Sequence, residues 1–275
     1  MTETFTVTFR GVRGSIACPG PKTARYGGNT PCVEVRCGGR LIIFDAGTGL
    51  RELGDEVSAT GKTVDADIFL SHAHIDHIGG IPFFAPFYES GHRFRIWSGN
   101  LAPASGTRAA IERMMGGPIF PIRPDAFKAD IDYRDFRAGE TLTPAPGLTL
   151  RTAPLDHPGG ATGYRLEFGG RALAYLTDNE SRKEFDPGLI ALARNADLAI
   201  YDCTYTDDEI VSKEGWGHSA WRDGLRLADA AGVKTFCLFH HAPEHDDDCM
   251  DRIAAEAGKI RPGTITAMEG RTLAL

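Results

Sequence analysis

The stretch FLSHAHIDHIGG, residues 69–80, contains three histidines and one aspartate within six positions, directly after an apolar run. The whole chain has only nine histidines, so a third of them lie here. His72 and His74 are two residues apart, so their side chains point the same way on an extended segment. Asp76 and His77 follow where the chain is expected to turn into a helix. Imidazole and carboxylate groups at this density predict a site for zinc, manganese or iron.

Other apolar runs in the chain also end in residue types that bind metals, namely His157, Asp178 and His240. In open α/β sheets, ligands bind beyond the carboxyl ends of strands, so these residues are expected to converge on the cluster. Each of the three, taken alone, is also compatible with an ordinary packed or solvated side chain. The predicted ligand set is His72, His74, Asp76, His77, His157, Asp178 and His240.

This set of seven ligands is too large for one tetrahedral zinc ion. Two divalent ions about 3.5–4 Å apart, sharing an aspartate, would use all seven. We expect zinc, with manganese as the alternative, because both metals accept the same ligands.

The composition is that of an ordinary globular protein, with 42% hydrophobic and 24% charged residues among 275. No basic region followed by an apolar stretch is seen at the N-terminus, and no apolar run reaches the length of a membrane span. The cysteines are scattered without CxxC spacing, so we expect reduced thiols in a cytoplasmic protein. They are Cys18, Cys32, Cys37, Cys203, Cys237 and Cys249.

The formal net charge is −7. Proteins that bind long nucleic acids usually present a basic face, because neutralising phosphates supplies much of their affinity. The charge therefore favours a small substrate, and we expect neither a nucleic-acid nor a membrane partner.

Strand-length apolar runs occur throughout the chain, and helical patterns follow several of the later ones. Helices are expected from Pro187, over 218–232 with a cap at Gly232, and over 246–258. Early strands followed by alternating strands and helices predict a layered α/β sandwich, formed by one domain over residues 1–275.

The motif HxHxDH at residues 72–77 resembles the signature of the metallo-β-lactamase superfamily, and LDHPGG, YLTDNE and LFHHAP further along fit the same pattern. The resemblance implies an αβ/βα four-layer sandwich with a dinuclear centre at one edge. It implies that Asp178 bridges the two metals and that Asp45 supports the site from behind. One metal would be held by His72, His74 and His157, and the other by Asp76, His77 and His240.

Two further segments, YDCTYTDDE (201–209) and WGHSA (216–220), are similar to paired elements of the transfer-RNA 3′-processing nucleases and their phosphodiesterase relatives. In that branch an acid, usually glutamate, pairs with a catalytic histidine. The resemblance implies that Asp202 and His218 fill these roles here. Residues 11–35 resemble the N-terminal loop of small phosphodiesterases that open cyclic mononucleotides.

Catalytic roles are expected for three residues. Asp76 would orient the attacking water, while His218, held by Asp202, would stabilise the phosphate or protonate the leaving oxygen. Contacts to phosphate or sugar are expected from Arg13, Asn29 and Thr48, although Arg13 could equally be structural.

The segment 81–137 is apolar and aromatic, and we expect an insertion that acts as a lid or a homodimer contact. Phe83, Phe84, Phe87 and Tyr88 could stack on a base, or could be core or interface residues.

The leading functional expectation is a phosphodiesterase that converts cyclic mononucleotides to linear monophosphates. The alternatives are an endoribonuclease of the transfer-RNA 3′-processing type, a thioester or lactone hydrolase, and a non-catalytic nucleotide sensor. The chain shows no long, basic, Gly/Pro-rich arm of the kind those nucleases use to hold RNA.

Overall fold

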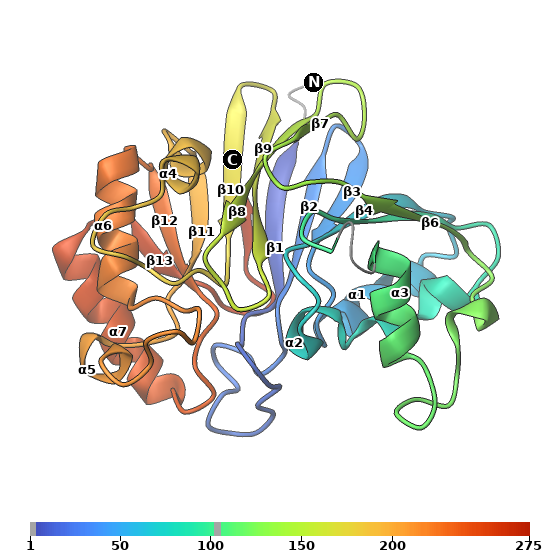
Figure 1. The fold of residues 1–275 in the computed structure, drawn as a ribbon, viewed down its shortest axis with the longest axis horizontal. Helices are drawn as coiled ribbons and strands as arrows, with labels where there is room; N and C mark the ends of the chain where they lie inside the picture. Colours follow the sequence, from blue (N-terminus) through green and yellow to red (C-terminus); the bar gives the residue numbers. More distant parts are fainter. Residues whose placement is uncertain (1–3, 102–105) are drawn as a thin grey trace.

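The computed structural model describes residues 4–101 and 106–275, and within these residues the strands form two seven-stranded sheets (Figure 1). The first sheet has the order β14 (Thr272–Ala274), β1 (Phe5–Gly11), β2 (Cys32–Cys37), β3 (Arg40–Phe44), β4 (Asp65–Leu70), β5 (Arg93–Ser98) and β6 (Asp130–Asp135). The second has the order β13 (Thr264–Thr266), β12 (Thr235–Phe239), β11 (Leu198–Asp202), β10 (Arg171–Leu176), β9 (Ala161–Phe168), β8 (Thr149–Leu155) and β7 (Thr141–Leu142).

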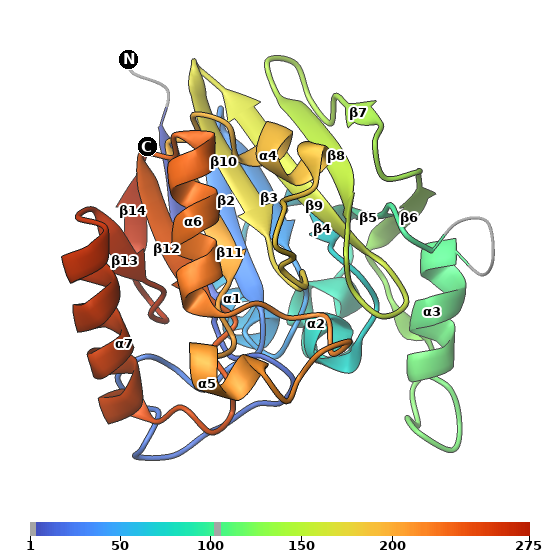
Figure 2. The same cartoon turned by 60° about the vertical axis from the view of Figure 1, so that its left-hand side comes forward.

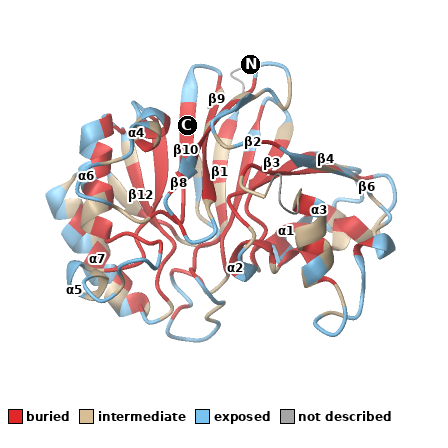
Figure 3. Cartoon of the chain, in the orientation of Figure 1, coloured by how far each residue is buried: buried red, intermediate tan, exposed pale blue. Residues whose placement is uncertain are grey.

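The two sheets pack against each other through their inner faces. Phe9 and Phe44 of the first sheet lie in one buried cluster with Tyr175 and Phe239 of the second. The rings of Phe44 and Tyr175 stack with centroids 5.2 Å apart. Figure 3 shows that buried residues run through both sheets and continue into loops at one edge of the sandwich.

Helices cover the outer face of each sheet, as Figures 1 and 2 show. Apolar residues of α1 pack on the outer face of the first sheet, and those of α4, α6 and α7 pack on the second. The αβ/βα four-layer sandwich expected from the sequence is therefore confirmed. The helices are α1 (Leu50–Ala59), α2 (Ile75–Ile78), α3 (Gly106–Met114), α4 (Pro187–Ala193), α5 (Asp207–Ile210), α6 (Trp221–Ala231) and α7 (Asp247–Ile260), with 3-10 turns η1 (Ile81–Phe83), η2 (Ala85–Tyr88) and η3 (Pro124–Ala126).

The helix signals in the sequence have clear physical counterparts. The Asp186 carboxylate caps α4 by accepting the amides of Gly188 and Leu189. Gly232 ends α6 in the left-handed conformation, with a φ of 66°. Of the helices that the structure describes, none is long and apolar enough to cross a membrane.

The segment 81–137 is not simply an insertion, because β5 and β6 lie within it and complete the first sheet. Charged residues interrupt the apolar pattern of both strands, so the strands are hard to recognise in the sequence. Arg95 of β5 is paired with Asp67 of β4 at 2.6 Å, so its charge is neutralised inside the sheet. β6 is an exposed edge strand, whose sequence DIDYRD shows little hydrophobic character.

The burial of two aromatic residues in this segment excludes them from base stacking, which the sequence had left open. Phe84 and Phe87 are fully buried in the core beneath α1 and are not available to stack on a base. The hydroxyl of Tyr88 donates to the carbonyl of Pro82 at 2.9 Å. Phe83 is exposed, and its ring meets Phe120 edge-on.

Candidate metal centre

The predicted ligands come together at one edge of the sandwich, where strands of both sheets end. The cluster at 72–77 follows β4 and runs into α2, which lies at the lower edge of the sandwich in Figure 1. His157 follows β8, Asp178 follows β10 and His240 follows β12. The first sheet therefore supplies four of the predicted ligands and the second supplies three.

Three residues at these strand ends have left-handed backbone conformations. The φ angles are 59° at Asp45, 58° at Asp178 and 61° at His240. Residues other than glycine adopt this region at a cost of order 1–3 kcal/mol, and such residues cluster at functional sites. Gly14 packs closely behind one of them, because a Cβ atom there would lie 2.4 Å from the His240 ring.

Asp178 lies between two groups of side chains, and each of its oxygens faces one group. Oδ2 is 3.7 Å from Nε2 of His72 and 3.6 Å from Nε2 of His157. Oδ1 is 3.3 Å from Nε2 of His77 and 3.2 Å from Nε2 of His240. This is the arrangement that a bridging carboxylate requires.

Asp76 lies with the second group. Its Oδ2 atom is 3.2 Å from Nε2 of His77 and 3.4 Å from Nε2 of His240. The same oxygen accepts the backbone N–H of Ser15 at 2.8 Å. Atoms of Asp76, His77 and His240 are thus close enough to share one ion, as are those of His72, His74 and His157.

The imidazole nitrogens show that the centre fits metal ions. The buried Nε2 atoms of His72, His77 and His240 have no hydrogen-bond partner among the described residues. Buried polar atoms are rarely left unpaired, so these atoms require a ligand. Donors 2.0–2.1 Å from a tetrahedral zinc ion lie roughly 3.3 Å apart, which matches the spacing around Asp178.

The opposite ring nitrogens are held by hydrogen bonds that orient the three rings. Nδ1 of His77 donates to Oδ2 of Asp45 at 2.8 Å. Nδ1 of His72 lies 3.0 Å from the Ser71 hydroxyl, and Nδ1 of His240 lies 3.0 Å from that of Thr204. These contacts turn each Nε2 atom toward the centre, as outer contacts of metal-binding histidines commonly do.

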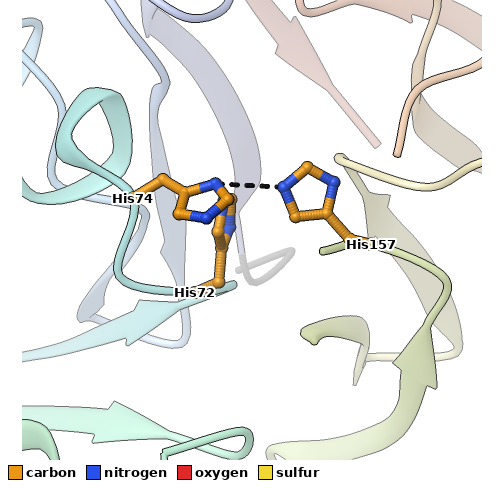
Figure 4. Close-up of side chains that lie close together, drawn as sticks. All are labelled: His72, His74 and His157. Carbon is orange, nitrogen blue, oxygen red and sulfur yellow. Dashed lines mark hydrogen bonds between the residues drawn. The ribbon is translucent and has the colours of Figure 1, made fainter. Parts of the chain in front are cut away.

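His74 and His157 face each other across the two sheets, with Nδ1 of His74 3.1 Å from Nε2 of His157 (Figure 4). Nδ1 of His157 donates to the carbonyl of Gly217 at 2.8 Å. Nε2 of His157 therefore carries a lone pair, which a shared ion would satisfy. Gly217 has a φ of 80°, and a Cβ atom there would lie 2.3 Å from the His157 ring.

Asp45 organises the site from beneath. Its carboxylate accepts the backbone N–H of Ser71 at 2.7 Å and the Ser71 hydroxyl at 2.8 Å, in addition to His77. A fourth bond comes from the hydroxyl of Tyr175 in the other sheet, at 2.7 Å. No sequence pattern indicates this role for Tyr175, whereas Ser71 and Thr204 lie within two positions of predicted site residues.

Electrostatics favour ionised carboxylates in the centre. Burial disfavours the charged form of Asp178, but His240 and His77 outweigh burial and hold its pKa well below the ordinary value. The pKa of Asp76 is also held low, because His77 and His240 outweigh its burial. Both side chains are therefore available as anionic ligands at neutral pH.

The residues Asp202 and His218 form a buried pair next to this cluster. Nδ1 of His218 donates to Oδ2 of Asp202 at 2.8 Å. The other oxygen of Asp202 accepts the backbone N–H and the hydroxyl of Thr204. Burial lowers the pKa of His218, but the Asp202 carboxylate outweighs this and raises it to about 9. The His218 ring stacks on that of His240, with centroids 4.9 Å apart.

The three residues expected to contact substrate lie outside the predicted metal cluster and the Asp202–His218 pair. Arg13 is fully buried, and its guanidinium donates to the backbone carbonyls of Gly27, Ala242 and His245, so it holds two loops together. The Thr48 hydroxyl donates to Asn29 at 3.0 Å. Asn29 in turn donates to Glu269, so these side chains are engaged within the protein and do not reach the centre.

The centre opens to the outside through a cleft of about 300 Å³. A second cavity of about 410 Å³ adjoins it, and Ser15 and His218 line both spaces. The cleft is lined by Ser15, His74, Ile75, Asp76, Asp178 and His218.

Comparison with known proteins identifies relatives that align with nearly the whole chain. Ribonuclease Z of Halorubrum lacusprofundi is 27% identical over an alignment of 312 residues, which includes 97% of this chain and 93% of the relative. The crystal structure of the metallo-β-lactamase fold protein YhfI from Bacillus subtilis superposes with a TM-score of 0.74 at 22% identity, covering 99% of this chain and 100% of the other. The short form of human tRNase Z gives a TM-score of 0.67 at 19% identity, covering 98% of each chain.

The family described as the β-lactamase superfamily domain matches residues 40–241, which span the sequence from β3 to the residue after His240. This range includes all seven predicted metal ligands and the Asp202–His218 pair. The chain therefore belongs to the metallo-β-lactamase superfamily.

Proposed function

We propose that this metal-dependent hydrolase is a phosphodiesterase that cleaves RNA. The observation that carries the proposal is the buried Asp202–His218 pair, whose imidazole lines the cleft beside the His/Asp cluster. An imidazole with a raised pKa is protonated at neutral pH and can donate a proton to a leaving oxygen. Relatives named Ribonuclease Z that align over nearly the whole chain support RNA as the substrate.

The cluster would hold two divalent ions, with zinc or manganese suited to its donors. We assign His72, His74 and His157 to one ion and Asp76, His77 and His240 to the other, with Asp178 between them. When bound, such ions lower the pKa of water and offset negative charge on phosphoryl oxygens.

The chain's own residues supply orientation and proton transfer. Asp76 lines the cleft and is placed to accept a hydrogen bond from the attacking water. As water adds to phosphorus, the bond from phosphorus to the leaving oxygen breaks. His218 donates its proton to that oxygen, and the proton lost by water passes to solvent. Asp202 holds Nδ1 of His218, so that Nε2 is the nitrogen that donates.

A smaller phosphodiester, such as a cyclic mononucleotide, is the second candidate. The net charge of −7 and the lack of a long basic arm favour it. The alignment with the Halorubrum protein spans 312 residues against 275 in this chain, so the relative carries segments that this chain lacks. The relatives' names nevertheless favour RNA, which reverses the order of substrates expected from the sequence.

The test compares substrates on one metal-loaded preparation, with metal-stripped protein as the control. A precursor transfer RNA with a 3′ trailer and a panel of cyclic mononucleotides are incubated separately, and the products are resolved. Metal-dependent internal cleavage of the RNA, without comparable opening of cyclic mononucleotides, would support the proposal. Opening of cyclic mononucleotides with intact RNA would establish the second candidate instead.

We further propose that the chain folds as one domain and forms a homodimer through the apolar part of segment 81–137. Phe83, Ile119 and Ile122 are exposed there. Sedimentation velocity of the wild type and of a variant with all three changed to serine tests this contact. A variant that stays dimeric would contradict it.

A further inference from the structure

The cavity beside the cleft has features that the metal centre does not explain. It has a volume of about 410 Å³ and lies between the segment after β11, α5 and the loop that follows His241. Aromatic, basic and acidic side chains all contribute to its wall. The lining residues that matter here are Tyr205, Glu209, Lys213, Trp216, His218 and Glu244.

Two aromatic rings, those of Tyr205 and Trp216, line the cavity together with His218. The Tyr205 ring meets His218 edge-on, with centroids 6.0 Å apart. Trp216 also lines the cavity and is 56% exposed, which is unusual for the largest apolar side chain. The ammonium group of Lys213 lies 4.0 Å from the Trp216 ring centroid and 5.9 Å from that of Tyr205.

The cavity adjoins the place where phosphodiester cleavage is proposed. Ser15 and His218 line both the cleft and the cavity, so a group attached to a phosphate in the cleft would lie beside the cavity. The His218 ring, which would protonate the leaving oxygen, forms part of the wall between the two spaces. The leaving group would therefore extend into the cavity.

The charged side chains of the wall limit which ligands the cavity can bind. The wall carries two carboxylates, Glu209 and Glu244, and its basic groups are the ammonium of Lys213 and the imidazole of His218. Glu209 also accepts hydrogen bonds from Nε2 of His245 at 2.9 and 3.0 Å, which fixes it in place. Glu209 and Glu244 would repel a phosphate placed beside them, whereas a neutral base carries no charge for them to repel.

We propose that this cavity binds the leaving nucleoside of the substrate, with its base stacked on Trp216. The inference rests on the proposed phosphodiesterase function and names a subsite for it. Stacking of a base on an aromatic side chain accounts for affinity without strong base preference. The cavity would serve a nucleoside of RNA or of a smaller phosphodiester in the same way.

The first arm of the test measures binding without turnover. Adenosine 5′-monophosphate is titrated into the metal-loaded protein while tryptophan fluorescence is recorded. The chain has three tryptophans, and Trp97 and Trp221 are buried, so a stacked base should quench mainly Trp216. Saturable quenching that disappears in Trp216→Phe is expected, and its absence in the wild type would overturn the proposal.

The second arm measures turnover of a dinucleoside monophosphate. Trp216→Ala should raise KM about tenfold or more, as loss of base stacking does, with little change in kcat. Trp216→Phe should keep most of the affinity. Val211→Ala is the matched control, because Val211 is an exposed apolar residue of the same segment that does not line the cavity.

The two arms separate the inference from the function on which it rests. Quenching without cleavage of any phosphodiester would support the subsite and overturn the proposed function. Cleavage with an unchanged KM in Trp216→Ala would support the function and overturn the subsite.

Discussion

The hydroxyl of Tyr175 donates a hydrogen bond to Oδ2 of Asp45 at 2.7 Å, although the two residues belong to different sheets. Asp45 also accepts hydrogen bonds from Nδ1 of His77 and from the Ser71 hydroxyl. The orientation of a predicted metal ligand from one sheet thus depends on a phenol from the other. Contact between the sheets and the geometry of the metal centre are directly linked.

Replacing Tyr175 by phenylalanine should therefore weaken metal binding. The buried Asp45 carboxylate would lose one of its donors, and hydrogen bonds to charged groups contribute about 1.5–3 kcal/mol. Because outer contacts of metal ligands affect affinity by at least tenfold, we expect a metal Kd roughly 10 times higher, measured by competition with a chelator. Tyr164→Phe is the control, since Tyr164 is equally buried but donates to the carbonyl of Leu70. Equal affinity in both variants would refute this role for Tyr175.

His218→Ala should reduce turnover and leave the metal content intact. General acid catalysis contributes about 10²–10⁴-fold, and the seven predicted ligands do not include His218. Activity assays and metal analysis of the same preparation give both quantities. If the variant keeps full phosphodiesterase activity, the assignment of His218 as the proton donor is wrong.

A plot of kcat against pH should show a falling limb at high pH that depends on the Asp202–His218 pair. His218 donates a proton only while it is protonated, so kcat should fall as the pH rises through its pKa. That pKa is raised to about 9 by Asp202, and bound divalent ions would move the limb to lower pH. In Asp202→Asn the carboxylate is lost while burial remains, so the limb should move further toward acid. A limb at the same pH in both proteins would contradict the assignment.

Metal removal should lower the thermal stability of the fold. The ligands come from both sheets, so bound ions would link strand ends that lie far apart in the sequence. Ions that bind only the folded chain stabilise it by about 4 kcal/mol when free metal is a thousand times Kd. Differential scanning calorimetry should show a higher Tm as free zinc increases. An unchanged Tm across that range would indicate that the cluster holds no metal.

Gly217→Ala should impair activity through the position of His157. The new Cβ atom would lie 2.3 Å from the His157 ring and would have to displace it. Gly215→Ala is a matched control, because Gly215 has a similar φ of 81° and no atom within 4 Å of its Cβ position. Both variants carry the same backbone strain, so a larger loss of kcat/KM in Gly217→Ala isolates the contact with His157.

The sequence predicted the sandwich and the convergence of the cluster, because both follow from local patterns. Apolar runs that end in histidine or aspartate place these residues at strand ends, and strand ends meet at one edge of a sheet. The HxHxDH motif adds four candidate ligands within six positions. These features depend on spacing along the chain and need no knowledge of contacts between distant elements.

The features that the sequence missed depend on contacts between elements. An arginine at position 95 would be expected on the surface from the sequence. Its pairing with Asp67 instead places it inside the sheet. The sequence left Arg13 open between a phosphate contact and a structural role, and its hydrogen bonds to backbone carbonyls favour the structural one. Tyr175 lies in an ordinary apolar run, and only the packing of the two sheets brings its hydroxyl to Asp45.

The left-handed conformations of Asp45, Asp178 and His240 have an evolutionary consequence. Glycine would adopt these conformations without strain, but it would remove the very side chains that converge on the centre. Substitutions selected only for a more stable apoprotein would therefore tend to erase the site. Three such residues at three strand ends therefore represent a cost in the stability of the apoprotein that the geometry of the centre imposes.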